Sequence, residues 1–288
     1  MPQTAQAVVA SRGPPSFGQP PMSFQPFVVG SGLSAWTLLK STIGTQKAAF
    51  GSNYVTQSDT KYFSDVFDTL DTPEDIVSNR RALRVVLGAY GLSDDIENRH
   101  FIKTVMAEGV TDPSALANKL SDRRYRALAG DFDFSKSPPS HKSIADLASR
   151  TVDNYLAQSF EIEIGKTDPD MRLALGFKRS LAELAQSATS NKAAWFQILA
   201  TPPIKEVVQT ALGLPTEFSK LDIDDQHQRI MEKASQVFGT DNVSELSAED
   251  VVEQMTRRFL IMRQAKSGGQ STSLQTALVL LSSIPKRE

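Results

Sequence analysis

The chain contains no cysteine, no long apolar run and no excess of charge of either sign. Without cysteine, disulfide bonds, thiolate metal sites and cysteine nucleophiles are excluded. No window reaches the roughly 20 apolar residues of a membrane-spanning helix, and the N-terminus lacks the basic flank and apolar stretch of a secretory signal peptide. The formal net charge is −2, with lysine and arginine scattered along the chain. We therefore expect no membrane insertion and no nucleic-acid partner.

Proline is concentrated near the N-terminus. Residues 1–26 carry prolines at positions 2, 14, 15, 20, 21 and 26, among glutamine, serine and glycine. So few apolar residues cannot offset the entropy of ordering, which predicts a disordered tail. From Ser34, which we interpret as a helix N-cap, apolar residues recur at spacings of three, four and seven, as in an amphipathic helix. This stripe consists of Trp36, Leu39, Ile43 and Phe50.

The remaining pattern is helical almost throughout, and no segment alternates with the period of a strand. Thr72–Pro73 and Asp168–Pro169 are typical helix starts, because a capping side chain precedes proline at the first position. The sequence thus predicts an all-α, multi-helix bundle. Its predicted units are the tail at 1–26, a first half at 34–134, long connecting helices at 141–187, a second half at 190–266 and a C-terminal helix at 271–284. The proline-containing segment 135–140 marks the main internal boundary.

Two stretches of the sequence resemble each other. Residues 76–96 align with residues 198–218 at a constant offset of 122 residues, with Gly91–Leu92 on Gly213–Leu214. The likeness extends with longer loops to about 76–134 and 198–262. Such self-similarity predicts a helix–turn–helix unit used twice. Each glycine is expected to end a helix in the left-handed conformation, with the following leucine turned back onto the helix.

Four local patterns could carry chemistry, and each has a simpler interpretation. Gly30-Ser31-Gly32 resembles a dinucleotide-binding loop, but no second strand follows, which favours a glycine hinge. The acidic run 221–225 resembles a calcium loop, yet His227 and Lys233 stand where glycine and glutamate are needed, so helix capping is the better explanation.

The three histidines, His100, His141 and His227, are far apart in sequence and lack neighbours typical of nucleophilic catalysis. The basic run 123–126 is interpreted as a structural or solvated helix face, on which Asp122 is expected to pair with Arg126. We therefore predict no catalytic, cofactor-binding or metal-binding residue.

Five stretches carry a resemblance to a known family: Tyr62–Phe63, Leu83–Gly109, Leu116–Phe134, Met171–Leu184 and Val207–Gln226. Over about residues 36–262 the chain resembles the DUF1217 family, uncharacterised alphaproteobacterial proteins often found in flagellar gene clusters. The resemblance implies no catalytic residues. It implies instead a flagellum-associated structural, assembly or regulatory factor that acts through protein–protein contacts.

The flagellar link leaves two locations open. Exported flagellar proteins tend to lack cysteine, whereas a cytoplasmic assembly factor would also have this composition. The predicted partner-binding residues are those of the two terminal apolar stripes, Trp36, Leu39, Ile43, Leu274, Leu278 and Leu281. The alternative function is a helical enzyme or small-ligand-binding protein whose pocket forms only in the fold.

Overall fold

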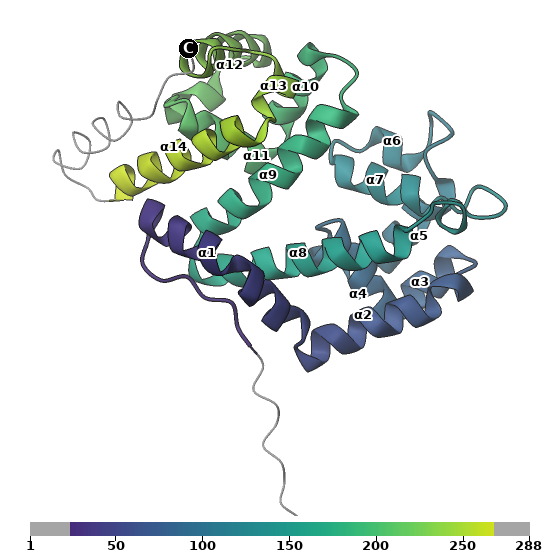
Figure 1. The fold of residues 1–288 in the computed structure, drawn as a ribbon. Helices are drawn as coiled ribbons and strands as arrows, with labels where there is room; N and C mark the ends of the chain where they lie inside the picture. Colours follow the sequence, from purple (N-terminus) through teal and green to yellow (C-terminus); the bar gives the residue numbers. More distant parts are fainter. Residues whose placement is uncertain (1–23, 268–288) are drawn as a thin grey trace, which may run out of the picture.

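The computed structural model describes residues 24–267 (Figure 1). This part of the chain forms fourteen α-helices and four short 3₁₀ helices and contains no strand, which confirms the predicted all-α class. The first half comprises α1 (Gly32–Gly51), α2 (Tyr54–Val66), η1 (Phe67–Thr69), α3 (Pro73–Ser78), α4 (Arg80–Ala89), η2 (Ser93–Asp95), α5 (Arg99–Glu108), α6 (Leu116–Lys119), α7 (Arg123–Asp131) and η3 (Ser140–Lys142). The second comprises α8 (Leu147–Thr167), α9 (Pro169–Ser187), α10 (Asn191–Ala200), α11 (Pro202–Ala211), η4 (Thr216–Lys220), α12 (Ile223–Phe238), α13 (Val243–Leu246) and α14 (Glu249–Ser267).

Two apolar cores share the long helix α8. Leu147 and Tyr155, on its first half, belong to a core built mainly from α2, α3, α4, α5 and α7. Phe160 and Ile164, on its second half, belong to a core built from α1, α9, α10, α11, α12 and α14. Figure 1 shows α8 passing through the middle of the molecule between the two groups of helices. Burying apolar side chains on both halves of one helix ties the cores together.

The turn between α8 and α9 forms as the sequence predicts. Asp168 precedes Pro169, and its Oδ1 atom accepts hydrogen bonds from the backbone nitrogens of Asp170 at 3.0 Å and Met171 at 3.1 Å. These bonds satisfy two donors that have no partner inside the helix. A comparable cap opens α3, where Thr72 and Asp75 form a reciprocal capping box.

Helix α1 packs on the second core although it precedes the first core in sequence. It begins at Gly32, with Ser31 as N-cap, three residues before the predicted N-cap Ser34. Trp36 and Leu39 are buried in the core that contains α14, and Figure 1 shows α1 lying beside α14. The predicted unit 34–134 therefore contains a helix whose apolar stripe is covered by the C-terminal half of the chain.

An N-terminal segment without helix or strand, which we call the strap (residues 24–31), lies along α1 (Figure 1). The Asn53 side chain accepts from the Phe24 backbone nitrogen and donates to the Phe24 carbonyl oxygen, both at 2.7 Å. The predicted disordered tail ends at residue 26, whereas residues 24–26 are held here: Asn53 bonds to the backbone of Phe24, Phe24 packs against the second core, and Pro26 is buried. The rest of that tail lies outside the described residues, as does the predicted helix 271–284.

Gly91 and Gly213 end α4 and α11 with the same geometry. Their φ angles are 70° and 71°, as predicted. The Leu92 backbone nitrogen donates to the Leu87 carbonyl at 2.8 Å, and the Leu214 nitrogen donates to the Gln209 carbonyl at 3.0 Å. This six-to-one hydrogen bond is the Schellman pattern, which needs a residue in the left-handed region.

We expect Gly213→Ala to lower the free energy of unfolding by about 1 kcal/mol, because a Cβ atom opposes positive φ. Gly91→Ala should cost more, since its Cβ would lie 2.7 Å from Gln158 Oε1, whereas the nearest atom at Gly213 is Met262 Cε at 3.7 Å. Gly44→Ala is the matched control, because this helical glycine has open space around it and should gain stability. Urea denaturation of the three variants measures the differences. Equal losses of unfolding free energy at all three positions would contradict the left-handed helix-ending role of Gly91 and Gly213.

Candidate functional site

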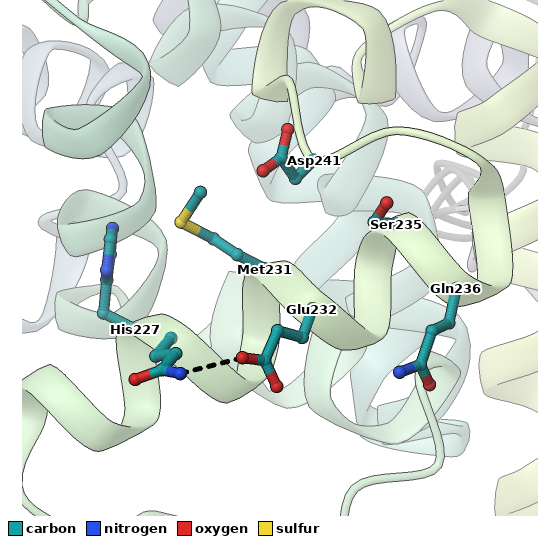
Figure 2. A pocket seen from close by; sticks show the side chains of 7 residues that line it. His227, Met231, Glu232, Ser235, Gln236 and Asp241 are labelled. Atoms are coloured by element: carbon teal, nitrogen blue, oxygen red, sulfur yellow. Dashed lines mark hydrogen bonds between the residues drawn. The ribbon is translucent and has the colours of Figure 1, made fainter.

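A shallow surface depression of about 530 Å³ lies on α12 (Figure 2). The His227 ring stacks on Phe196 with the ring centroids 4.6 Å apart. His227 Nε2 is buried and has no hydrogen-bond partner in the described part of the chain. Figure 2 shows Met231 between His227 and Asp241, so Asp241 does not face the histidine ring directly. In triad-type nucleophilic catalysis the histidine base is oriented by such a partner within hydrogen-bond reach.

A second depression, of about 440 Å³, lies between α11 and the end of α14. Three cationic side chains contribute to its lining, and two of them, Arg263 and Lys205, bond to other side chains of the chain. Arg263 contacts Asp170 at 2.6 Å and Glu206 at 3.2 Å, and its pKa is raised chiefly by the hydrogen bond to Asp170. Lys205 donates to Gln226 at 2.8 Å. These charges join α9, α11, α12 and α14 instead of converging on a ligand.

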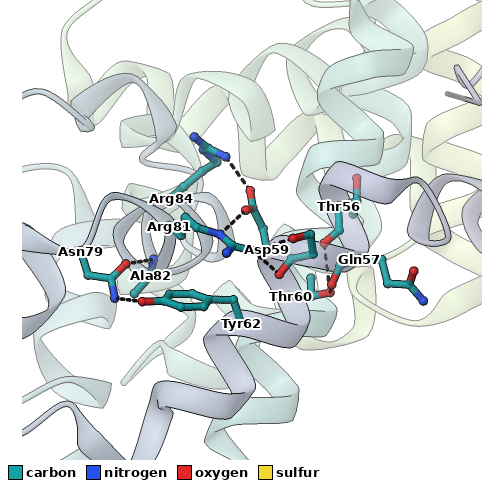
Figure 3. A network of polar contacts seen from close by, with 10 residues as sticks. Thr56, Gln57, Asp59, Thr60, Tyr62, Asn79, Arg81, Ala82 and Arg84 are labelled. Atoms are coloured by element: carbon teal, nitrogen blue, oxygen red, sulfur yellow. Dashed lines mark hydrogen bonds and ion pairs between the residues drawn. The ribbon is translucent and has the colours of Figure 1, made fainter. Parts of the chain in front are cut away.

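A buried polar network joins α2 to α4 (Figure 3). Asp59, on α2, is only 4 % exposed. Its carboxylate accepts from Arg81 Nε at 3.0 Å and from Arg84 Nη1 at 2.5 Å. Arg81 also stacks on the Tyr62 ring, with the guanidinium carbon 4.3 Å from the ring centroid. Each strong donor already has an acceptor from the chain itself, so the network is a structural link between two helices.

Asn79 and Ser58 extend the same network. Asn79 donates from its Nδ2 atom to the Tyr62 hydroxyl at 2.7 Å, while its Oδ1 atom caps α4 at Ala82. Arg81 Nη2 donates to the Ser58 hydroxyl at 2.7 Å. Sequence reasoning did not identify this network, because no local spacing links residues of α2 to residues of α4.

Two tyrosines are held as hydrogen-bond donors to aspartates. The Tyr90 hydroxyl donates to Asp131 Oδ2 at 2.6 Å, and the Tyr125 hydroxyl donates to Asp95 Oδ2 at 2.6 Å. Burial is the first cause that raises the pKa of both hydroxyls, that of Tyr125 to about 12, and the neighbouring carboxylate raises each further. Both hydroxyls therefore stay protonated at neutral pH and act as structural donors.

Glu161, on α8, is a buried acid whose pKa is raised. Burial raises its pKa, and the guanidinium of Arg179, 2.9 Å away, opposes that rise. A buried acid with a raised pKa is a frequent property of catalytic sites. Here, however, the carboxylate packs against Gly176 of α9, where a Cβ atom would lie 3.2 Å from Oε2, and it lines neither depression. Its contacts fasten the α8–α9 hairpin.

His141 is the histidine that the fold buries. Its ring is 1 % exposed and lies among Phe67, Phe132 and Phe134, with ring centroids 5.1 to 5.6 Å away. Neither ring nitrogen has a hydrogen-bond partner in the described part of the chain. Burial is the main cause that lowers its pKa. The sequence interpretation of a surface or interhelical histidine did not anticipate this aromatic cage.

The basic run on α7 has a structural role. Arg124 Nη1 donates to the Gly91 carbonyl, and Arg258, on α14, donates from Nε to the Ala211 carbonyl at 2.9 Å. Each arginine therefore donates to a carbonyl group at the C-terminal end of a helix, α4 or α11, that is followed by a left-handed glycine. Asp122 pairs with Arg124 at 2.7 Å and not with Arg126 as predicted, because Asp122 is the N-cap of α7 and its carboxylate faces the first turn.

The two sequence patterns that resemble ligand loops are helix starts. Gly30 and Gly32 precede and open α1, without the strands of a dinucleotide-binding unit in the described chain. Asp224 and Asp225 lie in the first turn of α12, the expected place for acids near a helix N-terminus. Within residues 24–267, no group of histidine and carboxylate side chains has the arrangement of a metal site.

The predicted partner-binding residues separate into two sets. Trp36 and Leu39 are buried against the second core and Ile43 is partly buried there, so in this conformation the chain itself covers them. Leu274, Leu278 and Leu281 lie outside the described residues. No helix between residues 24 and 267 combines the length and apolar composition required to cross a bilayer.

Large apolar side chains are nevertheless exposed close to the predicted set. Of the six most exposed in the described chain, five fall between residues 27 and 55, and the sixth is Ile223 on α12. The five lie on the strap, on α1 and at the start of α2, and they are Phe27, Val29, Leu38, Tyr54 and Val55. The three residues that sequence periodicity selects on α1 are thus on the side of this helix that packs against the second core.

Comparisons with known proteins give a family and a fold. A family model described as "Protein of unknown function (DUF1217)" matches residues 89–252. The chain is similar in structure to a structural genomics target protein from Agrobacterium tumefaciens, whose X-ray crystal structure is 26 % identical in sequence with a TM-score of 0.67. The match covers 84 % of this chain and 97 % of that chain. No curated protein matches the chain.

Proposed function

This chain belongs to the DUF1217 family, and from that premise we propose that it is a non-enzymatic protein that acts through protein–protein contacts. The observation that carries the proposal is the concentration of exposed apolar side chains between residues 27 and 55. We propose that these side chains contribute to one surface, because contiguous exposed apolar surface is characteristic of interaction sites. The ion pairs of Asp59, Glu161 and Arg263 also support it, because the partners of these groups lie on neighbouring helices of the same chain.

We infer from the family resemblance that the process served is flagellar assembly or structure. The absence of cysteine is compatible with both a cytoplasmic assembly or regulatory factor and an exported component. Mass spectrometry of sheared flagella and of cytoplasm distinguishes these locations. A strain that lacks the gene should show reduced motility, and normal motility with normal flagella would overturn the flagellar assignment.

We also propose that α3, α4 and α5 form one copy of a repeated unit and that α10, α11 and α12 form the other. Three features support this proposal: the order of the helices, the left-handed glycines Gly91 and Gly213, and the arginines Arg124 and Arg258 at the corresponding helix ends. Repeated units commonly pack as one body. In this protein the copy formed by α10, α11 and α12 would contribute to the core on which α1 and the strap pack.

A photo-crosslinking experiment tests the partner surface. A benzophenone amino acid replaces Tyr54, which is 73 % exposed, and in a matched control it replaces Ile223, which is 50 % exposed. We expect crosslinks to flagellar proteins from position 54 and none from position 223. The same products from both positions would indicate nonspecific contact and would contradict the proposed surface.

A further inference from the structure

The strap is recognised through its backbone. In addition to the Asn53 bonds at Phe24, the Gln46 side chain accepts from the Phe27 backbone nitrogen at 2.9 Å and donates to the Phe27 carbonyl oxygen at 3.3 Å. Gln46 is only 4 % exposed, and its Nε2 atom also donates to Thr42 Oγ1 at 3.0 Å. Two amide side chains, one on α1 and one in the turn between α1 and α2, thus bond to the strap backbone as a neighbouring strand would. We call Gln46, Asn53 and the side of α1 between them the strap seat.

The side chains of the strap alternate between covered and exposed positions. Phe24 and Val28 pack against the second core and Pro26 is buried, whereas Gln25, Phe27 and Val29 point outward. This period of two is the pattern of an extended segment. Pro26 suits the buried central position, because it has no backbone N–H that would need a partner. Backbone hydrogen bonds supply affinity for any extended chain, and the covered positions supply selectivity.

The strap is joined to α1 by a short hinge. Gly30 and Gly32 have φ angles of 84° and 61°, on either side of Ser31. Glycine adopts positive and negative φ with similar ease, so this joint can reverse the direction of the strap without the steric cost that other residues have. The outward side chains Phe27 and Val29 are 49 % and 56 % exposed, so the strap leaves apolar surface uncovered on its outer side.

We propose that the strap is exchanged between two copies of this chain, so that residues 24–28 of each copy occupy the strap seat of the other. A second copy is the partner that carries this extended segment with its aromatic and proline positions. The exchanged dimer keeps the same amide–backbone hydrogen bonds as the closed monomer, so the hinge and the new contact between copies decide the balance. That new contact forms next to the hinge, where Phe27 and Val29 would be covered.

A complementation experiment tests the exchange with the full chain. One variant loses the seat through Gln46→Leu and Asn53→Leu, and the other loses the strap through replacement of residues 24–28 by glycine and serine. Neither variant can form a reciprocal exchange alone, but the strap of the first fits the seat of the second. Light scattering coupled to size-exclusion chromatography should show the wild-type mass rising with concentration from 31.5 kDa towards twice that value. Each variant alone should stay monomeric, while their equimolar mixture should contain a heterodimer.

A peptide of residues 23–30 provides a second readout that does not depend on dimer formation. Fluorescence anisotropy should show it binding to the strap-deficient variant, and N-methylation at Phe27 should abolish binding because it removes the donor to Gln46. Circular dichroism verifies that both variants are folded. Peptide binding without heterodimer in the mixture would mean that the seat accepts a foreign segment and would overturn exchange between copies. A wild-type dimer that persists in a chain lacking both strap and seat would overturn it too.

The proposal is independent of the flagellar assignment, because it concerns self-association. Loss of the dimer in the strap variant with unchanged Tyr54 crosslinks would leave the proposed partner surface standing. Loss of the Tyr54 crosslinks with an intact dimer would instead contradict the proposed partner surface and leave the strap exchange standing. Each proposal can therefore be contradicted without the other.

Discussion

Asp59→Ala is expected to lower the free energy of unfolding by about 3 kcal/mol, the cost of removing one partner from a buried ion pair. The Asp59 carboxylate is the shared acceptor of Arg81 and Arg84, whose side chains are each 40 % exposed. Without it, two guanidinium groups of α4 lie close together at the contact with α2 and share no carboxylate. Because α2 buries only Thr56, Asp59 and Phe63, little apolar packing remains to hold this helix in place.

Asp65→Ala is the matched control on the same helix. Asp65 pairs with Lys61 at 2.8 Å, but both side chains are more than half exposed, so solvent screens the pair and its loss should cost under about 0.5 kcal/mol. Chemical denaturation measures both variants, and hydrogen exchange locates the change. We expect faster exchange in α2 and α4 and unchanged exchange in α11 and α14. Similar costs for both aspartates would show that the buried network does not link the helices.

The helical framework could be predicted from the sequence because its signals are local. Thr72–Pro73 and Asp168–Pro169 open helices, and Gly91 and Gly213 end them, through bonds that span six residues or fewer. Capping and positive φ depend on the residue and its immediate neighbours. The sequence therefore gives the helix ends with little knowledge of the tertiary fold.

The polar network and the strap seat could not be predicted, because their partners are far apart in sequence. Arg81 and Arg84 follow Asp59 by 22 and 25 residues, and Gln46 follows Phe27 by 19. Charged and amide side chains are mostly exposed in proteins, so the sequence alone favours solvent exposure for Asp59 and Gln46. The two side chains are buried because α2 packs on α4 and the strap packs on α1.

The segment 135–140 shows the same limitation. Proline and small polar residues predict a boundary there, yet the neighbouring backbone is packed. Asp133 is fully buried, and its backbone nitrogen donates to Ser140 Oγ at 2.8 Å. The Phe134 backbone nitrogen donates to the Met106 carbonyl at 3.1 Å. This loop therefore closes over the first core and brings His141 into it.

We expect the first core to lose stability in the range between pH 6.5 and the lower pKa that His141 has in the folded protein. Its pKa is lowered in the folded protein from an ordinary value of 6.5, first by burial and then by Lys142, while the carboxylates of Asp71 and Asp68 oppose the shift. In this range the unfolded chain binds more protons than the folded chain. The stability that the neutral ring contributes is thus complete above pH 6.5 and is lost as the pH falls toward the folded pKa. The slope cannot exceed about 1.4 kcal/mol per pH unit for one proton.

His141→Leu isolates this contribution, because leucine fills the aromatic cage without a titrating group. Glu161, whose raised pKa gives a slope of opposite sign, is present in both proteins and cancels in the difference between their stability curves. That difference should grow as the pH falls below 6.5 and should stay constant above it. His100→Gln, at an exposed histidine on α5, controls for histidine loss outside the cage. Parallel curves for His141→Leu and wild type from pH 8 to 5 would show that the caged ring is not the source of acid sensitivity.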